Sequence, residues 1–290
     1  MFLVTGITGH VGGATAQNLL EKGHKVRALV RNPEKASAWQ QKGVELMPGD
    51  LNDSGAVTSA LRGVEGAYIM LPPLLAPQRG FPEAKAVIAS YVEALRQAPP
   101  QRLVVLSSIG AEKSERLGLI TALHLLEQAL APFTFPTAFI RAGSFHENSI
   151  PLLDIAAQSG ALYSFYQPVD RAVPSIATRD IGALAAQLLA DRSWTGKRIL
   201  ELGSPCTPNE TARAISEVLG RPVTAQAVPR DRWTATVESF GVPPGGTWAY
   251  EEMVDSVNSG WINFGVPGTE QVPATTKPAQ VFAAARDSSA

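Results

Sequence analysis

The sequence predicts an α/β protein with a doubly wound parallel sheet of the Rossmann type, followed by a smaller C-terminal α+β region. Three observations predict it. Short apolar runs alternate with longer amphipathic stretches through the first half of the chain, and a glycine-rich turn follows the first apolar run. Hydrophobic residues make up 45% of the 290 residues, which is enough for a large core. Strands and helices that alternate in this way form a parallel sheet covered by helices.

Strands are expected where four to six residues rich in Val, Ile, Leu or aromatic side chains stand together. In chain order these are residues 2–5, 25–30, 44–47, 67–71, 102–107 and 137–141. Helix candidates lie between them, for instance residues 11–22, which end at Gly23, and residues 82–97, which end before Pro99. Glycine commonly ends a helix and proline cannot continue one, so these boundaries favour successive strand–helix units.

After Arg141 the alternation loosens, and we expect the chain to leave the sheet and return once. A helix over residues 179–192 and a strand over residues 197–203 make the return. We therefore predict a Rossmann domain over residues 1–150, completed by about 176–203, and a smaller substrate-binding region over about 151–175 and 204–290. Expected elements of the smaller region are a helix from the Thr207–Glu210 capping box to Gly220, a strand over 223–229, and helices over 230–240, 248–261 and 278–285.

Composition limits the functions that the chain can have. Its 25 Lys and Arg nearly balance 26 Asp and Glu, so a net charge of −1 provides no broad attraction for nucleic acid or an anionic membrane. Cys206 is the only cysteine, which excludes an intramolecular disulfide, and the four histidines are too scattered to suggest a metal site. No apolar run approaches a membrane span, and the start MFLVTG lacks signal-peptide features. We expect a cytoplasmic protein that acts on a small molecule.

The strongest chemical motif is VTGITGHVGG, residues 4–13, at the end of the first predicted strand. Its glycines leave room beside a helix that begins near Val11, so backbone N–H groups at the positive helix end face an open space. A pyrophosphate fits there. A tight turn without a ligand is the alternative, but the place in the first strand–helix unit favours a dinucleotide. The expected contacts are Gly6, Thr8, Gly9, His10, Val11 and Gly12.

The residue after the second strand decides which dinucleotide is expected. A site for NAD usually has Asp or Glu there to accept from the ribose 2′-hydroxyl, but this strand continues into VRNPEK with Arg31 at that point. A guanidinium binds a 2′-phosphate through paired charged hydrogen bonds, whereas a carboxylate repels it. The sequence therefore predicts NADP(H). An exposed loop cation is the alternative reading of Arg31.

Residues after the third and fourth strands extend the expected cofactor site. Asp50 is placed to accept from an adenine amino group and Leu51 to line its face, while Asp53 is equally well explained as a helix cap. Leu71 and Pro72 follow the fourth strand and are expected to run beside the middle of the cofactor, because ligands gather at the carboxyl ends of parallel strands.

With these residues the chain resembles the NmrA-like group of atypical short-chain dehydrogenases/reductases, which includes quinone and azo reductases. The resemblance covers most of the chain, through GITGHVG, VRNPEK, GDLND, RLVVLSSIGA, IRAGSFHENSI and LGRPVTAQAVPRDRW. It implies an NADP(H)-binding Rossmann domain and a small C-terminal region that closes a cleft over the nicotinamide.

Two departures from the wider family affect the expected chemistry. The Tyr-x-x-x-Lys pair that exchanges a proton with alcohols and carbonyls is absent, because no tyrosine of the chain has a lysine four residues later. Related ether and isoflavone reductases have a lysine on the helix after the fifth strand, and residues 119–130 contain none. Lys113 precedes that helix and is read as a solvated loop lysine.

Polar residues around the fifth strand are therefore the candidates for chemistry. Ser107 and Ser108 end this strand, and we read them as cofactor or substrate contacts; a buried serine bonded to the backbone is the alternative for Ser107. His124 is the candidate catalytic residue, since the resemblance places a polar residue there and histidine donates protons near neutral pH. A surface pair of His124 with Glu127, one turn along the helix, is the alternative.

The segment AGSFHENSI, residues 142–150, is expected to cross the nicotinamide pocket. Gly143 permits close backbone approach, Phe145 stacks on a ring, and His146 adds a polar group toward the substrate. Trp233, in the second region, is expected to form part of an apolar wall, with a place in the core as the alternative.

These expectations converge on a reductase that lacks a dedicated tyrosine acid. Such an enzyme transfers hydride from NADPH to a quinone, an azo compound or another activated conjugated acceptor, because the reduced product is stable as an anion and solvent completes protonation. Two alternatives stay open: a non-catalytic NADP(H) sensor that binds a regulatory protein, and a reductase of imines or enones in a biosynthetic pathway. A homodimer is also compatible with the sequence.

Overall fold

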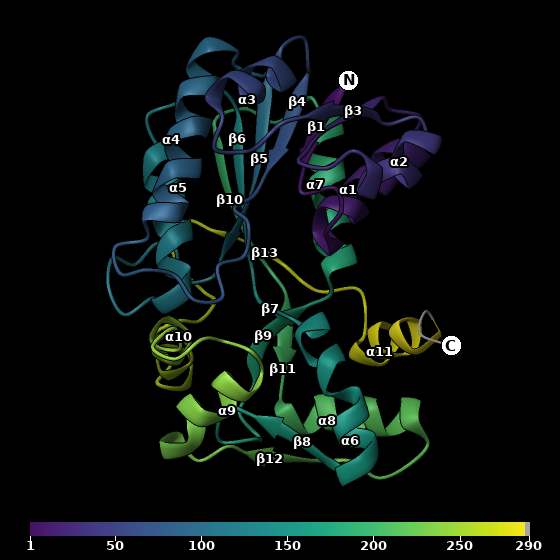
Figure 1. The fold of residues 1–290 in the computed structure, drawn as a ribbon, viewed down its shortest axis with the longest axis vertical. Helices are drawn as coiled ribbons and strands as arrows, with labels where there is room; N and C mark the ends of the chain where they lie inside the picture. Colours follow the sequence, from purple (N-terminus) through teal and green to yellow (C-terminus); the bar gives the residue numbers. More distant parts are fainter. Residues whose placement is uncertain (288–290) are drawn as a thin grey trace.

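A computed structural model describes residues 1–287 and contains one large parallel sheet (Figure 1). All its neighbouring strands are parallel. From edge to edge the eight strands are β13 (Glu270–Val272), β10 (Lys197–Leu202), β6 (Thr137–Ala142), β5 (Arg102–Ser108), β4 (Gly66–Ile69), β1 (Phe2–Thr5), β2 (Val26–Val30) and β3 (Glu45–Pro48). The order reverses beside β1, which is the topological switch point where such sheets bind ligands.

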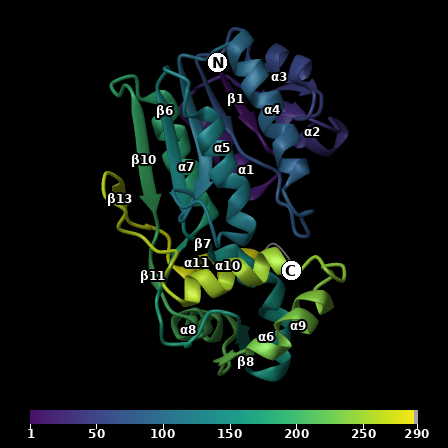
Figure 2. The same ribbon diagram turned by 90° about the vertical axis from the view of Figure 1, so that its left-hand side faces the viewer.

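Helices cover both faces of this sheet (Figures 1 and 2). One face carries α1 (His10–Glu21), α2 (Ser37–Gln41) and α7 (Thr178–Ala190), and the other carries α3 (Ser54–Leu61), α4 (Pro82–Gln97) and α5 (Thr121–Leu130). Successive strand residues enter opposite cores: Val104 packs in the first and Val105 in the second. Strands buried on both sides explain the continuous apolar runs of the sequence.

The second region lies beyond the carboxyl ends of the strands (Figure 1). It contains two small sheets, one of β7 (Ser144–Phe145), β9 (Val173–Ile176) and β11 (Ser204–Cys206), the other of β8 (Ala161–Ser164) and β12 (Thr224–Ala227). Its helices are α6 (Leu153–Ser159), α8 (Pro208–Leu219), α9 (Trp233–Ser239), α10 (Trp248–Asn258) and α11 (Pro278–Asp287). Short 3₁₀ turns occupy Glu34–Ala36, Gly118–Ile120, His146–Leu152 and Arg230–Arg232.

The strands of the main sheet were predicted except for β13. The tail was expected to contain only a helix, yet residues 270–272 pair with β10 and extend the sheet. Three residues, two of them polar, carry no period-2 signal that would identify a strand. By contrast, the capping box at Thr207 is present in full: the Thr207 hydroxyl accepts from the Glu210 amide at 3.0 Å, and the Glu210 carboxylate accepts from the Thr207 amide at 2.7 Å.

Residues 1–287 contain neither a membrane-spanning helix nor a cluster of metal-binding side chains. Over this range, no helix has both the length and the apolar character needed to cross a membrane. Within the same range, no group of three or more His, Cys, Asp or Glu side chains is arranged to hold a metal ion.

Candidate active site

The glycine loop between β1 and α1 has the geometry that close approach to a phosphate requires. Gly6 has a φ of +66°, which an L side chain rarely adopts. A Cβ atom on Gly12 would clash with the Gly6 carbonyl, whereas one on Gly9 would come no closer than 3.4 Å to it. Gly9 is the N-cap of α1 and provides no side chain to cap the helix. The first amides of α1 therefore face an open cradle, and a pyrophosphate fits it.

Arg31 follows β2 directly and is exposed. β2 pairs with β1 in parallel, with Thr5 opposite Leu29, so Arg31 and the glycine loop lie at the same edge of the sheet, one strand apart. No ion pair involving Arg31 occurs among residues 1–287. Its guanidinium is available to a 2′-phosphate, and that contact remains a prediction.

Some of the residues after β3 and β4 that were expected to contact the cofactor have other partners or are buried. Asp53 caps α3, because its carboxylate accepts from the amides of Gly55 at 2.8 Å and Ala56 at 3.2 Å. Asp50 holds its own turn, accepting from the Asn52 amide at 2.8 Å, so only its second oxygen is left for an adenine. Leu51 packs partly against the core, and beyond β4 Leu71 is buried while Pro72 is exposed.

Ser107 is not a free contact at the end of β5. Its hydroxyl donates to Oε1 of Glu127 at 2.5 Å, and only 3% of the residue is exposed. The hydroxyl hydrogen is thus already engaged, so a contact of Ser107 with cofactor or substrate would use its oxygen as an acceptor and stays a prediction. Ser108 is more accessible and donates to the Ile109 carbonyl at 3.0 Å, which leaves its oxygen able to accept.

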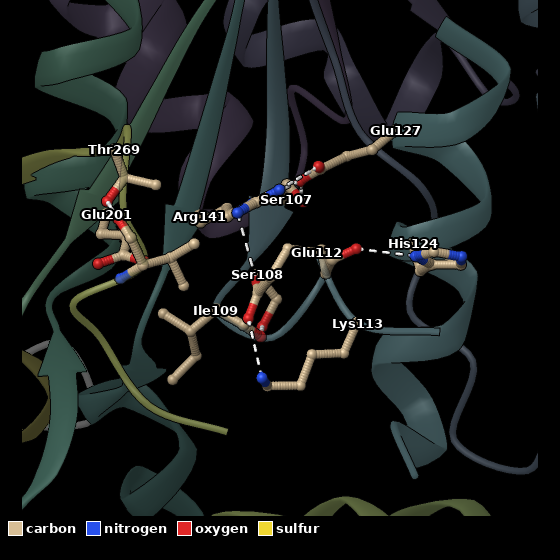
Figure 3. Close-up of polar contacts among 12 residues, drawn as sticks. Ser107, Ser108, Ile109, Glu112, Lys113, His124, Glu127, Arg141, Glu201 and Thr269 are labelled. Carbon is tan, nitrogen blue, oxygen red and sulfur yellow. Dashed lines mark hydrogen bonds and ion pairs between the residues drawn. The ribbon is translucent and has the colours of Figure 1, made fainter. Parts of the chain in front are cut away.

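Glu127 belongs to a buried ionic network and does not form the expected surface pair with His124. Its two oxygens accept from Nε and Nη2 of Arg141 at 3.0 and 2.7 Å (Figure 3). Arg141 also lies 3.3 Å from Glu112, which in turn is 3.8 Å from Lys113. Burial alone would lower the pKa of Arg141, but the hydrogen bonds and charge of Glu127 raise it above its ordinary value.

Lys113 is not a solvated loop lysine. Its ammonium lies 4.2 Å from the ring centroid of Trp261 and faces Glu112. These residues line a hollow of about 330 Å³ together with residues 260 and 263–267. Sequence reasoning missed this network because a strand arginine and a loop glutamate have no motif; the one available signal was an arginine inside the apolar run TAFIR.

His124 is oriented by the backbone. Its Nδ1 lies 2.9 Å from the Ala111 carbonyl, and because a carbonyl only accepts, Nδ1 carries a hydrogen and Nε2 faces away from this bond (Figure 3). The ring is half-buried. The structure thus holds the imidazole in one direction at the start of α5, and its catalytic role stays a prediction.

The loop between β5 and α5 is fastened to α10. The Gly118 amide donates to Oε1 of Glu252 at 3.0 Å, and the Ser256 hydroxyl donates to the Arg116 carbonyl at 2.6 Å. Arg116 has a φ of +58°, unusual for a residue with a side chain. A Cβ atom on Gly118 would clash with the Ala249 carbonyl. The second region therefore determines where the loop carrying Ala111 lies.

The residues predicted to contact the nicotinamide or the substrate differ in how deeply they are buried. Gly143 does allow a close approach, but to the backbone of β9, where a Cβ atom would lie 2.5 Å from the Pro174 carbonyl. Phe145 is half-buried and packs against the first core. His146 is 6% exposed, and burial lowers its pKa, so its expected contact with substrate is not supported.

Trp233 is a core residue and does not form part of an apolar wall beside the substrate, as had been expected. None of it is exposed, its indole N–H donates to the Val228 carbonyl at 2.8 Å, and its ring packs edge-on against Phe165. The indole fills the space between α9 and α10 and has no free face for a ligand. Its aromatic character fitted both readings, and the sequence alone did not distinguish them.

Both halves of the chain are similar to known protein families. A model of NAD(P)H-binding proteins matches residues 6–142, and a model of the NmrA-like family matches residues 121–259. The chain is 29% identical to a (4-alkanoyl-5-oxo-2,5-dihydrofuran-3-yl)methyl phosphate reductase of Streptomyces griseus subsp. griseus, covering 97% of this chain and 95% of that protein. It is 27% identical to the NAD(P)H azoreductase of Xenophilus azovorans, over 98% and 96%.

Two further similarities agree with these. Quinone oxidoreductase 2 of Escherichia coli K12 is 28% identical over 84% of each chain. Among solved structures, triphenylmethane reductase of Citrobacter sp. superimposes with a TM-score of 0.80 at 24% identity, over 99% of each chain, which shows a shared fold. Both the Rossmann part and the smaller region are therefore common to this chain and its relatives.

Proposed function

We propose a function from one premise: residues 6–142 of the chain match NAD(P)H-binding proteins and residues 121–259 match the NmrA-like family. It is an NADPH-dependent reductase that transfers hydride to a quinone, an azo compound or another activated conjugated acceptor. The observation that carries this is the glycine cradle with the exposed Arg31 one strand away, in a chain similar over most of its length to proteins named as an azoreductase, a quinone oxidoreductase and a (4-alkanoyl-5-oxo-2,5-dihydrofuran-3-yl)methyl phosphate reductase.

The main sheet and its glycine loop hold the cofactor in this proposal. The α1 amides bind the pyrophosphate, and Arg31 binds the 2′-phosphate through charged hydrogen bonds. Bound NADPH supplies a hydride ion. Residues 1–150, with about 176–203, form the part that binds it, and residues of about 151–175 and 204–290 cover the acceptor.

Protonation of the product needs no strong acid from the chain. A reduced quinone is stable as an anion until solvent supplies a proton, which agrees with the missing Tyr-x-x-x-Lys pair. His124 is the proposed donor within the site: the Ala111 carbonyl holds its Nδ1–H, and in the imidazolium form Nε2 carries a second proton, which passes to the product and is replaced from solvent. The main task of the protein is to position the two reactants.

The test is the rate of NADPH oxidation by purified protein with a panel of quinones, azo dyes, enals and cyclic imines, beside NADH and protein-free controls. Turnover with quinones or azo dyes supports the proposal, and turnover confined to imines or enals moves it to a biosynthetic reductase. Tight NADPH binding without turnover of any acceptor would instead favour a sensor with a regulatory protein partner. His124→Ala then tests the proposed proton donor through the pH profile of turnover.

A further inference from the structure

A second hollow, of about 340 Å³, lies between two loops that are far apart in the sequence. One loop follows β4 and leads to α4, and the other leads into α10. Its lining residues include Pro77, Arg79, Pro243, Pro244 and Trp248. The loops touch closely, because a Cβ atom on Gly246 would lie 2.6 Å from the Ala76 side chain.

Arg79 is the one charged residue that lines this hollow. Its guanidinium lies 4.6 Å from the ring centroid of Trp248. No carboxylate pairs with it among residues 1–287, in contrast to Arg27, Arg141, Arg198 and Arg230, which all have acidic partners. The hollow therefore presents a positive charge that the described protein does not neutralise.

The indole under Arg79 is held in place. Its N–H donates to the Pro77 carbonyl at 3.3 Å, and Phe81 packs edge-on against the ring with centroids 5.8 Å apart. Phe81 itself adopts a left-handed backbone conformation with a φ of +54°. A guanidinium stacked on a fixed indole is preorganised, so it loses less freedom when it binds a ligand.

Two exposed hydrophobic residues lie close in sequence to the two loops that line the hollow. Leu75 adjoins the first loop and is 69% exposed, and Phe240 precedes the second and is 50% exposed. They are the two most exposed large hydrophobic residues described. Prolines provide rigid walls without N–H donors. Apolar side chains around a single cation match a ligand that is flat and apolar at one end and anionic at the other.

We propose that this hollow binds the anionic substituent of an aromatic acceptor, a sulfonate or carboxylate, with Arg79 as the residue that determines this specificity. The inference rests on the proposed reductase function. The first loop begins at Leu71 and Pro72, at the carboxyl end of β4, where ligands of doubly wound sheets gather. An acceptor whose conjugated part lies over that end can extend its charged end to Arg79.

The test uses two azo dyes that differ in one charge: 4-dimethylaminoazobenzene and its 4′-sulfonate. Arg79→Met should lower kcat/KM for the sulfonate about tenfold, the size expected for one charge-assisted pair, and leave the neutral dye within about twofold. Arg79→Lys should retain an intermediate rate, because it keeps the charge and loses the planar fork. Arg96→Met, an exposed arginine in the last turn of α4, is the matched control and should change neither rate.

Added salt provides a second readout. The KM for the sulfonate should rise with ionic strength in the wild type and much less in Arg79→Met, because an exposed ion pair is screened. An equal loss of both dyes in Arg79→Met would show that Arg79 supports the loop and does not bind the anion. Unchanged rates with both dyes would also overturn the proposal.

Binding can be followed without turnover, which separates this inference from the proposed function. The probe is 8-anilinonaphthalene-1-sulfonate, titrated by fluorescence onto protein saturated with NADP⁺. We expect Arg79→Met to weaken its binding about tenfold and Arg96→Met to leave it unchanged. If the wild type reduces neither dye, the reductase assignment fails, yet binding that depends on Arg79 still supports the site. Probe binding that Arg79→Met leaves unchanged would refute the proposed anion site.

Discussion

At the scale of single residues, the proposed preference for NADPH depends on Arg31. Replacing it by glutamate removes the charged hydrogen bonds to a 2′-phosphate and adds repulsion, so Arg31→Glu should weaken NADPH binding by about 100-fold and NADH binding by far less. Fluorescence titration with each nucleotide measures this. Equal losses for the two nucleotides would exclude Arg31 from the 2′-phosphate site.

The buried pair of Glu127 and Arg141 should matter for stability more than any surface pair. Glu127→Ala leaves Arg141 buried without its bidentate partner and should lower the free energy of unfolding by about 3–5 kcal/mol. Glu45→Ala breaks the pair of Arg27 and Glu45, where Glu45 is 46% exposed. This control should cost less than about 1 kcal/mol in the same urea titration. Similar losses in both variants would contradict the assigned burial.

His146 should make stability depend on pH. Burial lowers its pKa from the ordinary 6.5, with Glu147 and Asp180 acting in the opposite direction. The unfolded chain therefore binds a proton more readily than the folded one, so this contribution to stability is complete above pH 6.5 and is lost as the pH falls below it. His146→Gln should flatten the unfolding free energy between pH 7 and 5, while His10→Gln, at an exposed residue, should preserve the wild-type slope.

The sequence predicts the roles of some site residues and not of others. Arg31 and the glycines could be selected from the sequence because the roles predicted for them depend on backbone position within a strand–helix unit, which the sequence displays. Trp233 and Lys113 were misread, and the partner of Ser107 was missed, because these side chains contact residues distant in sequence: Glu127 lies 20 residues from Ser107, and Trp261 lies in another region of the fold. Side-chain partners of this kind follow from tertiary packing, which no local pattern encodes.

At the scale of elements, the β1–α1 turn depends on one glycine more than on its neighbours. Gly12→Ala places a Cβ atom against the Gly6 carbonyl and should both destabilise the fold and abolish NADPH binding, whereas Gly9→Ala meets only an ordinary contact at 3.4 Å. Thermal unfolding and NADPH titration of the two variants test this. Gly9→Ala should keep the wild-type melting temperature within about 2 °C. A stable Gly12→Ala variant that binds NADPH would refute the close packing.

Element boundaries were predicted well where a physical signal marks them. Gly23 and the Thr207 capping box ended or began helices as expected, because both act through local backbone hydrogen bonds. The short β13 was not predicted, because its pairing with β10 depends on a sheet edge more than 60 residues earlier in the chain.

At the scale of the whole molecule, the second region controls the β5–α5 loop. Ser256→Ala removes the hydrogen bond to the strained Arg116 and should speed amide exchange in residues 109–118, while the amides of β1 and α1 keep their protection. Ser239→Ala, which removes a bond of 2.6 Å confined to its own stretch of chain, should leave exchange in that loop unchanged. Hydrogen–deuterium exchange with mass spectrometry compares them. Unchanged exchange in Ser256→Ala would show that α10 does not hold the loop.

The place of β13 has a consequence for synthesis of the protein. The outer neighbour of β10 comes from residues 270–272, so β10, which ends at Leu202, is synthesised well before it acquires that neighbour. Until then β10 is an uncovered edge with free backbone groups, which invites pairing with a second nascent chain. A chain that terminates at residue 268 should therefore aggregate during expression even though its nucleotide cradle is complete.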